Sequence, residues 1–313
     1  MKSFRLHQRL LIFLLITLAL TCALSPWIAL GADWVSRYWP AVLGERVPFP
    51  RIFNRSFMIS AIIVFIVGRR LLNPNQLTKL LAVPFSVAAK NLQLGIALAL
   101  ASMVFLIVTM TVAEIYTPFF RLSLADSLAR FASALASGVF VGFLEEIFFR
   151  GMLFLSLHDQ GRPVRAYVLA NLFYSLLHFV KPGASYFLDH LDPMAGFRHL
   201  LTTFEPFLEP VPLLPGIFGL FLIGVVLSYA LARTGNLYLS IGLHGGWVIG
   251  LKTIRVFGDF TRQDLGWAFG STDPKIVSGV VTWVGILLVG VAVYWLTRKG
   301  WLSAADRLRA AAA

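Results

Sequence analysis

Long apolar runs alternate with short polar segments along the whole chain, and no stretch reads as a separate soluble domain. A helix needs about 17–25 predominantly apolar residues to cross a bilayer. Eight runs approach or reach this length: Leu10–Leu30, Ile52–Gly68, Leu92–Val112, Phe131–Leu157, Val164–Val180, Leu213–Ala232, Asn236–Ile254 and Ile276–Leu296. The pattern predicts an all-α membrane protein with about eight transmembrane helices.

The composition agrees with this prediction. Hydrophobic residues make up 58% of the 313 residues, and charged residues only 13%. A soluble domain carries about 25% charged residues, so this deficit excludes a water-soluble protein. The formal net charge is +12, but the cations lie in short segments beside the apolar runs, where they contact lipid headgroups and set topology. We therefore expect the lipid bilayer, and not nucleic acid, as a partner.

The basic residues also predict an orientation. If the N-terminus is cytoplasmic, the inner side holds 15 of the 27 basic residues, namely Lys2, Arg5, Arg9, Arg69, Arg70, Lys79, Lys90, Arg150, Arg162, Arg165, Arg233, Arg298, Lys299, Arg307 and Arg309. Positive charge favours the cytoplasmic side. We expect both termini to be cytoplasmic, in a bacterial inner membrane. The first 25 residues resemble a signal peptide, but apolar character continues past Pro26, which favours an uncleaved first span.

Two features outside the main pattern receive structural interpretations. Residues 181–212 form the longest polar connection in the second half of the chain and include His190 and His199. Their spacings do not match a metal site, so we expect a solvated loop. The single cysteine, Cys22, lies in an apolar run and is expected to be a small packing residue.

Ionisable side chains inside three of the apolar runs are the candidates for chemistry. An ionisable group in a span costs about 2.5–3.5 kcal/mol on insertion scales, and such groups are functional candidates by default. The fourth run carries Glu145, Glu146 and Arg150, the fifth carries His178, and the seventh carries His244.

Helical geometry predicts which of these groups meet. Glu146 and Arg150 are four residues apart, share a helix face and can pair. Glu145 points about 100° away and needs a partner from another helix. With a rise of about 1.5 Å per residue, Glu145 and His178 lie roughly 18 and 21 Å below the turn between their runs. His244 comes from the same side at roughly 12 Å depth, with Gly242, Gly245 and Gly246 around it that would permit close helix approach.

Structural interpretations remain open beside the catalytic one. Glu146 and Arg150 can form an internal ion pair that only holds the bundle together. An intramembrane histidine can be a hydrogen-bonded helix contact. Glu145 is harder to explain structurally, because no residue three or four positions from it in the sequence carries an opposite charge.

The order of these residues resembles that of a known family. Glu145-Glu146-x-x-x-Arg150, an aromatic-x-x-x-His at Tyr174 to His178, and His244 in a Gly-rich helix are similar to the motifs of the CPBP family. This family contains CAAX-processing and bacteriocin-processing enzymes, including intramembrane glutamic endopeptidases of the Ras-converting type. The resemblance covers residues 131–251, with 1–130 as N-terminal transmembrane helices with interfacial segments, and 252–313 as a last helix and a short basic tail.

The resemblance implies a fold and a mechanism. The implied fold is an eight-helix bundle enclosing a polar intramembrane cavity. Glu145 would activate a water with His178, His244 would stabilise the oxyanion, and Glu146 and Arg150 would be a supporting pair. No cofactor is implied, although glutamate and histidine are also acceptable zinc ligands. The partner would be a membrane-associated peptide or protein substrate.

Two positions depart from the family pattern. Tyr174 stands where the second motif normally has Phe, and Val248 stands where the third motif has Asn or Asp. If that missing side chain donates to the oxyanion, its loss would lower the rate by about 10²–10³-fold. The leading hypothesis is therefore an intramembrane endopeptidase of unknown substrate, and the alternative is a non-proteolytic membrane regulator or immunity-type protein on the same scaffold.

Overall fold

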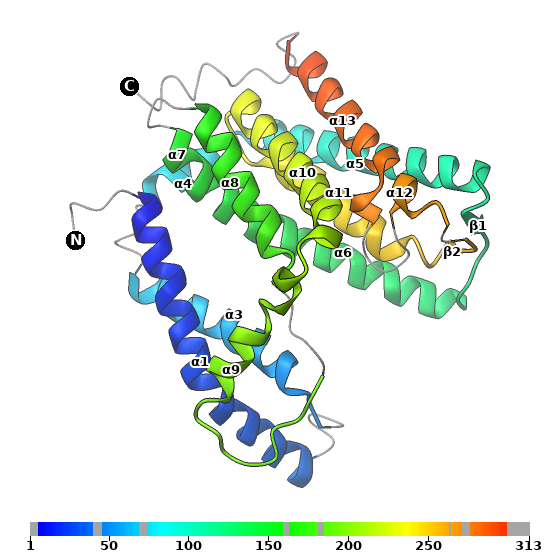
Figure 1. The fold of residues 1–313 in the computed structure, drawn as a ribbon. Helices are drawn as coiled ribbons and strands as arrows, with labels where there is room; N and C mark the ends of the chain where they lie inside the picture. The colour runs from blue at the N-terminus through cyan, green and yellow to red at the C-terminus, as the bar shows by residue number, and fades with distance from the viewer. Residues whose placement is uncertain are drawn as a thin grey trace. The chain divides into compact units, whose positions relative to one another are not determined.

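The computed structural model describes residues 6–39, 46–68, 74–158, 163–180, 185–262, 264–270 and 276–298. The basic tail predicted from the sequence lies outside this part, as do several of the cations used to predict topology. The chain divides into two compact units, residues 1–74 with 176–213 and residues 75–175 with 214–313. Figure 1 shows the helices and strands of both units.

Six helices of the described residues are long and apolar enough to cross a membrane, and they indicate an integral membrane protein: Gln8–Tyr38, Phe49–Gly68, Phe85–Val112, Leu124–His158, Val211–Thr234 and Val280–Arg298. The predicted fifth and seventh runs are also helical, as α8 (Pro163–Leu177) and α11 (Tyr238–Thr253). At about 1.5 Å per residue they are only about 22–24 Å long, against about 30 Å of hydrocarbon. The all-helical prediction is thus confirmed, with six candidate spans where about eight were expected.

The first unit is built from two long helices and a segment that returns to them later in the chain. Its elements are α1 (Leu6–Tyr38), α3 (Phe49–Gly68), α9 (Ala195–Thr202) and the 3₁₀ turns η2 (Glu205–Leu208) and η3 (Val211–Leu213). Cys22 is buried in its apolar cluster with Phe49 and Phe53, which confirms the packing role expected for the cysteine.

The prediction of a solvated loop over residues 181–212 was wrong for its central part. Helix α9 packs on α1 and buries His199, which is 1% exposed, against the rings of Phe49 and Phe53. The hydroxyl of Tyr186 lies 3.3 Å from the His199 Nδ1 atom. The segment is amphipathic, and its apolar face is what the sequence reading missed.

The second unit contains most of the helices and the candidate site residues from the fourth and seventh runs. Its elements are α4 (Pro74–Leu81), α5 (Phe85–Val112), β1 (Tyr116–Pro118), α6 (Leu124–Glu146), the π-helix η1 (Ile147–Phe154), α7 (Leu155–His158), α8, α10 (Leu214–Thr234), α11, β2 (Gly258–Phe260), α12 (Gly266–Phe269), η4 (Ile276–Ser278) and α13 (Val280–Arg298). Strands β1 and β2 pair antiparallel and form a short ribbon that the sequence did not predict.

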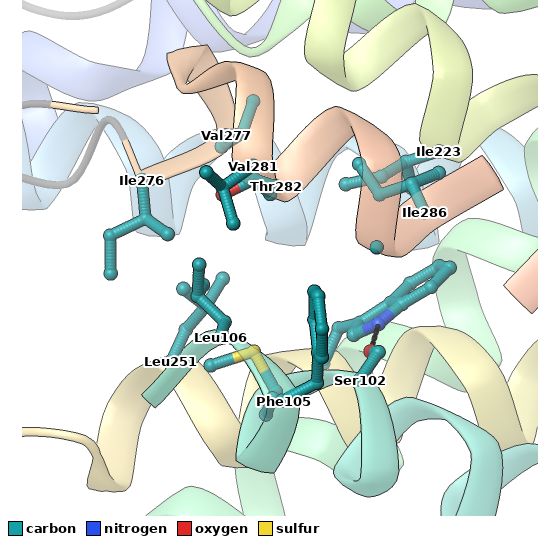
Figure 2. Close-up of a pocket in the computed structure, with 13 residues that line it drawn as sticks. Ser102, Phe105, Leu106, Ile223, Leu251, Ile276, Val277, Val281, Thr282 and Ile286 are labelled. Atoms are coloured by element: carbon teal, nitrogen blue, oxygen red, sulfur yellow. Dashed lines mark hydrogen bonds between the residues drawn. The ribbon is translucent and has the colours of Figure 1, made fainter. Parts of the chain in front are cut away.

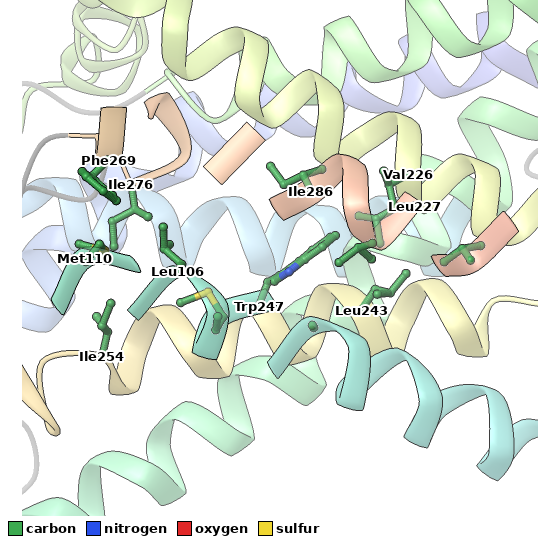
Figure 3. Packing of buried hydrophobic residues seen from close by; sticks show 14 of the residues in the cluster. Leu106, Met110, Val226, Leu227, Leu243, Trp247, Ile254, Phe269, Ile276 and Ile286 are labelled. Atoms are coloured by element: carbon green, nitrogen blue, oxygen red, sulfur yellow. The ribbon is translucent and has the colours of Figure 1, made fainter. Parts of the chain in front are cut away.

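Helix α11 is the centre of this unit. It packs most extensively on α5 and α6 and also contacts α10 (Figure 1). Its apolar side chains Leu243 and Trp247 join the main buried cluster with residues of α5, α10 and α13, as Figure 3 shows. Because α11 is buried by its neighbours on most of its surface, the residues on it are fixed by helix packing.

Glycines allow α11 to approach α5 and α6 closely. A Cβ atom built on Gly95 of α5 would lie 2.5 Å from the Leu239 carbonyl oxygen of α11, and one on Gly138 of α6 would lie 2.7 Å from the Gly245 carbonyl oxygen. Real Cβ atoms do not come this close to backbone. Small residues at helix interfaces permit this approach in membranes, and the expectation from the Gly-rich seventh run is confirmed.

The turn before α11 is fixed by a buried amide pair. The Asn91 side-chain amide of α5 donates to the Asn236 Oδ1 atom at 3.1 Å, and Asn236 in turn donates to the Thr234 carbonyl oxygen. Gly235 supplies the positive φ of 70° that the turn requires. The entry of α11 is therefore anchored to α5 at the first turn.

We expect Gly95→Ala and Gly285→Ala to shift stability in opposite directions. The added methyl group at Gly95 meets α11 backbone, and overpacking of this kind costs about 1–3 kcal/mol. At Gly285 of α13 the nearest atom to a built Cβ is 3.8 Å away, so the gain of about 0.5–1 kcal/mol for Ala over Gly in a helix should remain. Thermal unfolding in detergent measures both, and equal shifts would contradict the close-approach argument.

The burial of His199 predicts an acid-sensitive first unit. Burial lowers the pKa of His199 below its usual value of 6.5. The unfolded segment therefore binds more protons, and the stability that neutral His199 contributes is complete above about pH 6.5 and is lost as the pH falls. Amide-exchange protection factors of α9 should fall between pH 7.5 and pH 5.5, whereas His199→Phe should make them insensitive to pH. Unchanged pH dependence in that variant would refute the assignment.

Candidate active site

The predicted pair Glu146–Arg150 is formed and fully buried. Arg150 Nη1 donates to Glu146 Oε1 at 2.9 Å, and both side chains are 0% exposed. Glu146 is the last residue of α6, and Arg150 lies in the π-helix η1 that continues it. Such π-segments inside α-helices are frequent at functional sites. The widened turn brings the Arg150 guanidinium also within 3.5 Å of the Gly224 carbonyl oxygen of α10.

His244 makes a contact with Glu146 that the sequence did not predict. The His244 Nδ1 atom lies 2.8 Å from Glu146 Oε1, the same oxygen that Arg150 contacts. Glu146 is therefore more than the partner of Arg150, because its carboxylate links α6, η1 and α11. The Oε1 atom of this buried carboxylate contacts side chains of the protein, as a group removed from water requires, whereas its Oε2 atom is buried with no hydrogen-bond partner among the described residues.

Glu145 also finds its partner on α11, as the helix-face argument requires. The His244 Nε2 atom lies 3.7 Å from Glu145 Oε2, and the Glu145 side chain is 31% exposed whereas that of His244 is 6% exposed. The two ring nitrogens of His244 thus face the two adjacent glutamates. This arrangement places a glutamate with a part-exposed side chain beside a buried imidazole, and the Glu145 Oε2 atom that faces the ring is itself buried.

Aromatic rings complete the surroundings of His244. The Tyr174 ring of α8 lies edge-on to the His244 ring, with centroids 6.2 Å apart and an interplanar angle of 89°. The Arg150 guanidinium carbon lies 4.3 Å from the centre of the Tyr174 ring, a favourable cation–π distance. Phe149 packs on Tyr174 at 5.0 Å between ring centroids. Tyr174, predicted as a supporting residue, contacts both Arg150 and His244.

A second polar contact joins α8 to α10. The Ser228 hydroxyl of α10 donates to Asn171 Oδ1 at 3.0 Å, and Gly224 leaves the space for the Asn171 side chain. These contacts fix the helix that carries Tyr174. Asn171 lies in the fifth apolar run of the sequence, but the spacing alone does not reveal its partner.

His178 does not lie within the fifth helix as predicted. Helix α8 ends at Leu177, and His178 lies in the turn that follows it. The sequence explains this end, because Pro182 and Gly183 follow shortly and the residue before a proline disfavours helix. His178 belongs to the first compact unit, so its pairing with Glu145 stays a prediction.

The residues around position 248 have other contacts than the family pattern suggests. Val248 is apolar, and the neighbouring Trp247 donates its Nε1 hydrogen to the Ser102 hydroxyl of α5 at 2.9 Å. Trp247 and Ser102 line an apolar pocket together with Leu251 and residues of α13, shown in Figure 2. Neither Glu145 nor His244 lines this pocket, and the polar cavity implied by the resemblance stays a prediction.

Zinc was left open by the sequence. Among the described residues, no group of three or more His, Cys, Asp or Glu side chains is arranged to hold a metal ion.

The comparison with known families agrees with these motifs. Residues 126–250 match the model of the family described as type II CAAX prenyl endopeptidase, Rce1-like. The chain contains an Rce1-like domain. No curated protein and no solved structure is significantly similar to the chain. The matched residues cover most of α6 and α11 and every element between them, and thus every residue of the Glu145–Glu146–His244 cluster. The match confirms the resemblance of this domain to CAAX-processing enzymes.

The buried ion pair predicts a large effect of removing one charge. Arg150→Met leaves the Glu146 carboxylate buried with His244 as its remaining donor, and breaking such a pair costs about 3–5 kcal/mol. The double variant Arg150→Met with Glu146→Gln removes both charges and should recover most of this loss. Thermal unfolding in detergent gives both values. Arg262→Met, at an exposed pair with Asp264, is the control and should change little.

Proposed function

We propose that the chain is an intramembrane endopeptidase in which Glu145 activates a water molecule. The observation that carries the proposal is the contact of a part-exposed glutamate with a buried histidine inside an Rce1-like domain. The Glu145 side chain is 31% exposed, and it lies within a candidate membrane span. A carboxylate next to an imidazole is a general-base arrangement that contributes about 10²–10⁴-fold in many enzymes.

The reaction is hydrolysis of a peptide bond. Glu145 takes a proton from water while the water oxygen attacks the carbonyl carbon, and the carbonyl oxygen becomes an oxyanion. Collapse of the tetrahedral intermediate breaks the bond to nitrogen as a proton is delivered to the leaving amine. The family pattern assigns His178 to Glu145 and His244 to the oxyanion, and this proposal adopts the pairing of His178 with Glu145.

The substrate is proposed as a chemical class, and the location of the protein as a type of membrane. A membrane-associated peptide or protein is the substrate class, and the family's name makes a prenylated CAAX peptide the natural probe. We place the protein in a bacterial inner membrane with both termini cytoplasmic, on the weak bias of basic residues. Metal analysis of purified protein, with activity that resists chelators, would support a reaction carried by side chains alone.

A non-proteolytic regulator on the same scaffold is the second candidate function. Val248 favours it, because this position lacks the polar side chain of the family pattern, and Trp247 donates to Ser102 instead. The two candidates differ in their dependence on Glu145. A regulator keeps its cellular phenotype when only the carboxylate charge is removed, and a protease loses it.

We expect Glu145→Gln to reduce cleavage by at least about 10²-fold without loss of membrane insertion, because Gln cannot accept the proton from water. Purified wild-type and variant protein in detergent would be incubated with a fluorogenic prenylated CAAX peptide, and the cleavage rate measured. Glu209→Gln, at an exposed glutamate of the first unit, is the matched control and should retain the wild-type rate. Full activity of the Glu145 variant would exclude the proposed mechanism.

A further inference from the structure

The contacts of Glu146 determine which nitrogen of His244 carries a hydrogen. Arg150 is always protonated and donates to Glu146 Oε1. A carboxylate held by a guanidinium is ionised and can only accept hydrogen bonds. The His244 Nδ1 atom lies 2.8 Å from the same oxygen, so this nitrogen must be the donor. The structure therefore selects the Nδ1–H tautomer of neutral His244.

This tautomer changes what His244 can do for Glu145. In a neutral Nδ1–H ring the Nε2 atom is an acceptor and has no hydrogen to donate. Nε2 lies 3.7 Å from Glu145 Oε2 and faces away from Glu146. In the resting protein, the Nε2 atom of His244 can therefore accept a proton from Glu145. It becomes a donor only after it has taken one.

We propose that Glu146 is a positioning residue that makes His244 a proton relay for Glu145, in place of the fixed oxyanion donor that the family pattern implies. This proposal rests on the proposed endopeptidase function. Glu145 removes a proton from water as the oxygen–carbon bond forms. The proton passes from Glu145 to His244 Nε2, and Glu146 stabilises the imidazolium through Nδ1–H. His244 then delivers the same proton to the amine nitrogen as the carbon–nitrogen bond breaks, which restores both groups.

The packing around the ring supports a fixed orientation. The edge-on Tyr174 ring lies against His244, and Arg150 lies against the face of Tyr174. Close approach of α11 to α6 at Gly142 and Gly245 holds the backbone on the other side, because a Cβ on Gly142 would lie 3.0 Å from the Gly245 nitrogen. A flip of the His244 ring would break the contact of Nδ1 with Glu146 Oε1 and turn the ring carbon Cδ2 toward that oxygen. The relay geometry is therefore built into the helix packing.

Substitutions of His244 distinguish a proton relay from a fixed hydrogen-bond donor to the oxyanion. Gln can donate a hydrogen bond from near the Nε2 position but cannot accept and release a proton at neutral pH. For a relay, His244→Gln and His244→Ala should be equally slow, within about threefold, and about 10²–10⁴-fold below wild type. If His244→Gln cleaves the fluorogenic prenylated CAAX peptide at least about tenfold faster than His244→Ala, the donor role holds and the relay is refuted.

The tautomer itself is measured by ¹⁵N NMR of histidine-labelled protein at pH 7.5, which does not need substrate. The chain has six histidines, and the His244→Gln spectrum identifies the signals of His244 by their loss. Wild type and Glu145→Gln should both show the Nδ1–H tautomer. Glu146→Gln should lose this preference together with activity, and Tyr174→Phe, which keeps the ring, should retain the preference.

Each failure has a separate meaning. An Nε2–H tautomer or a doubly protonated His244 in resting wild type would overturn the positioning role, even if Glu146→Gln fails to fold. Absence of cleavage by wild type would count against the proposed function and leave the tautomer readable. Cleavage that depends on Glu145, combined with an active His244→Gln variant, would keep the endopeptidase and remove the relay.

Discussion

A carboxylate buried among apolar helices must find its hydrogen-bond donors within the protein, and Glu146 imposes this requirement on the second unit. Its donors are Arg150, one turn along its own helix, and His244 on α11. Without Arg150 the negative charge would be too costly to bury, and without α11 at close range the histidine could not reach it. Glycines of α5, α6 and α11 allow this contact, because they let α11 pack close enough for His244 to reach Glu146.

The sequence predicts those parts of this arrangement that depend on one helix. Apolar runs located the helices, and the i, i+4 spacing located the Glu146–Arg150 pair. Glycine spacing around His244 indicated close packing of the seventh run. In each case, the relevant distance is fixed by the geometry of a single helix or by the small size of a residue.

The parts that were missed depend on how separate elements rotate and end. The Glu146–His244 contact requires the rotation of α11 about its axis, which periodicity does not set when nearly every face is buried. The depth match of Glu145 and His178 assumed a regular rise, and the π-helix η1 and the end of α8 at Leu177 both break that assumption. The packing of α9 was overlooked because polar residues dominate its segment and conceal one apolar face.

The π-helix also limits how this family motif tolerates insertion and deletion. Over Ile147–Phe154 the chain has more residues per turn than an α-helix. The Leu155 backbone N–H donates to the Arg150 carbonyl oxygen, five residues earlier. Deleting one residue there would let the segment relax into a regular helix with its hydrogen bonds intact. Because the wide turn absorbs one residue, the helical segments before and after it would keep nearly the same rotational alignment. A deletion between Glu146 and Arg150 would instead place the guanidinium three residues from the carboxylate in place of four, so a change that is mild for folding would alter the geometry of the buried ion pair.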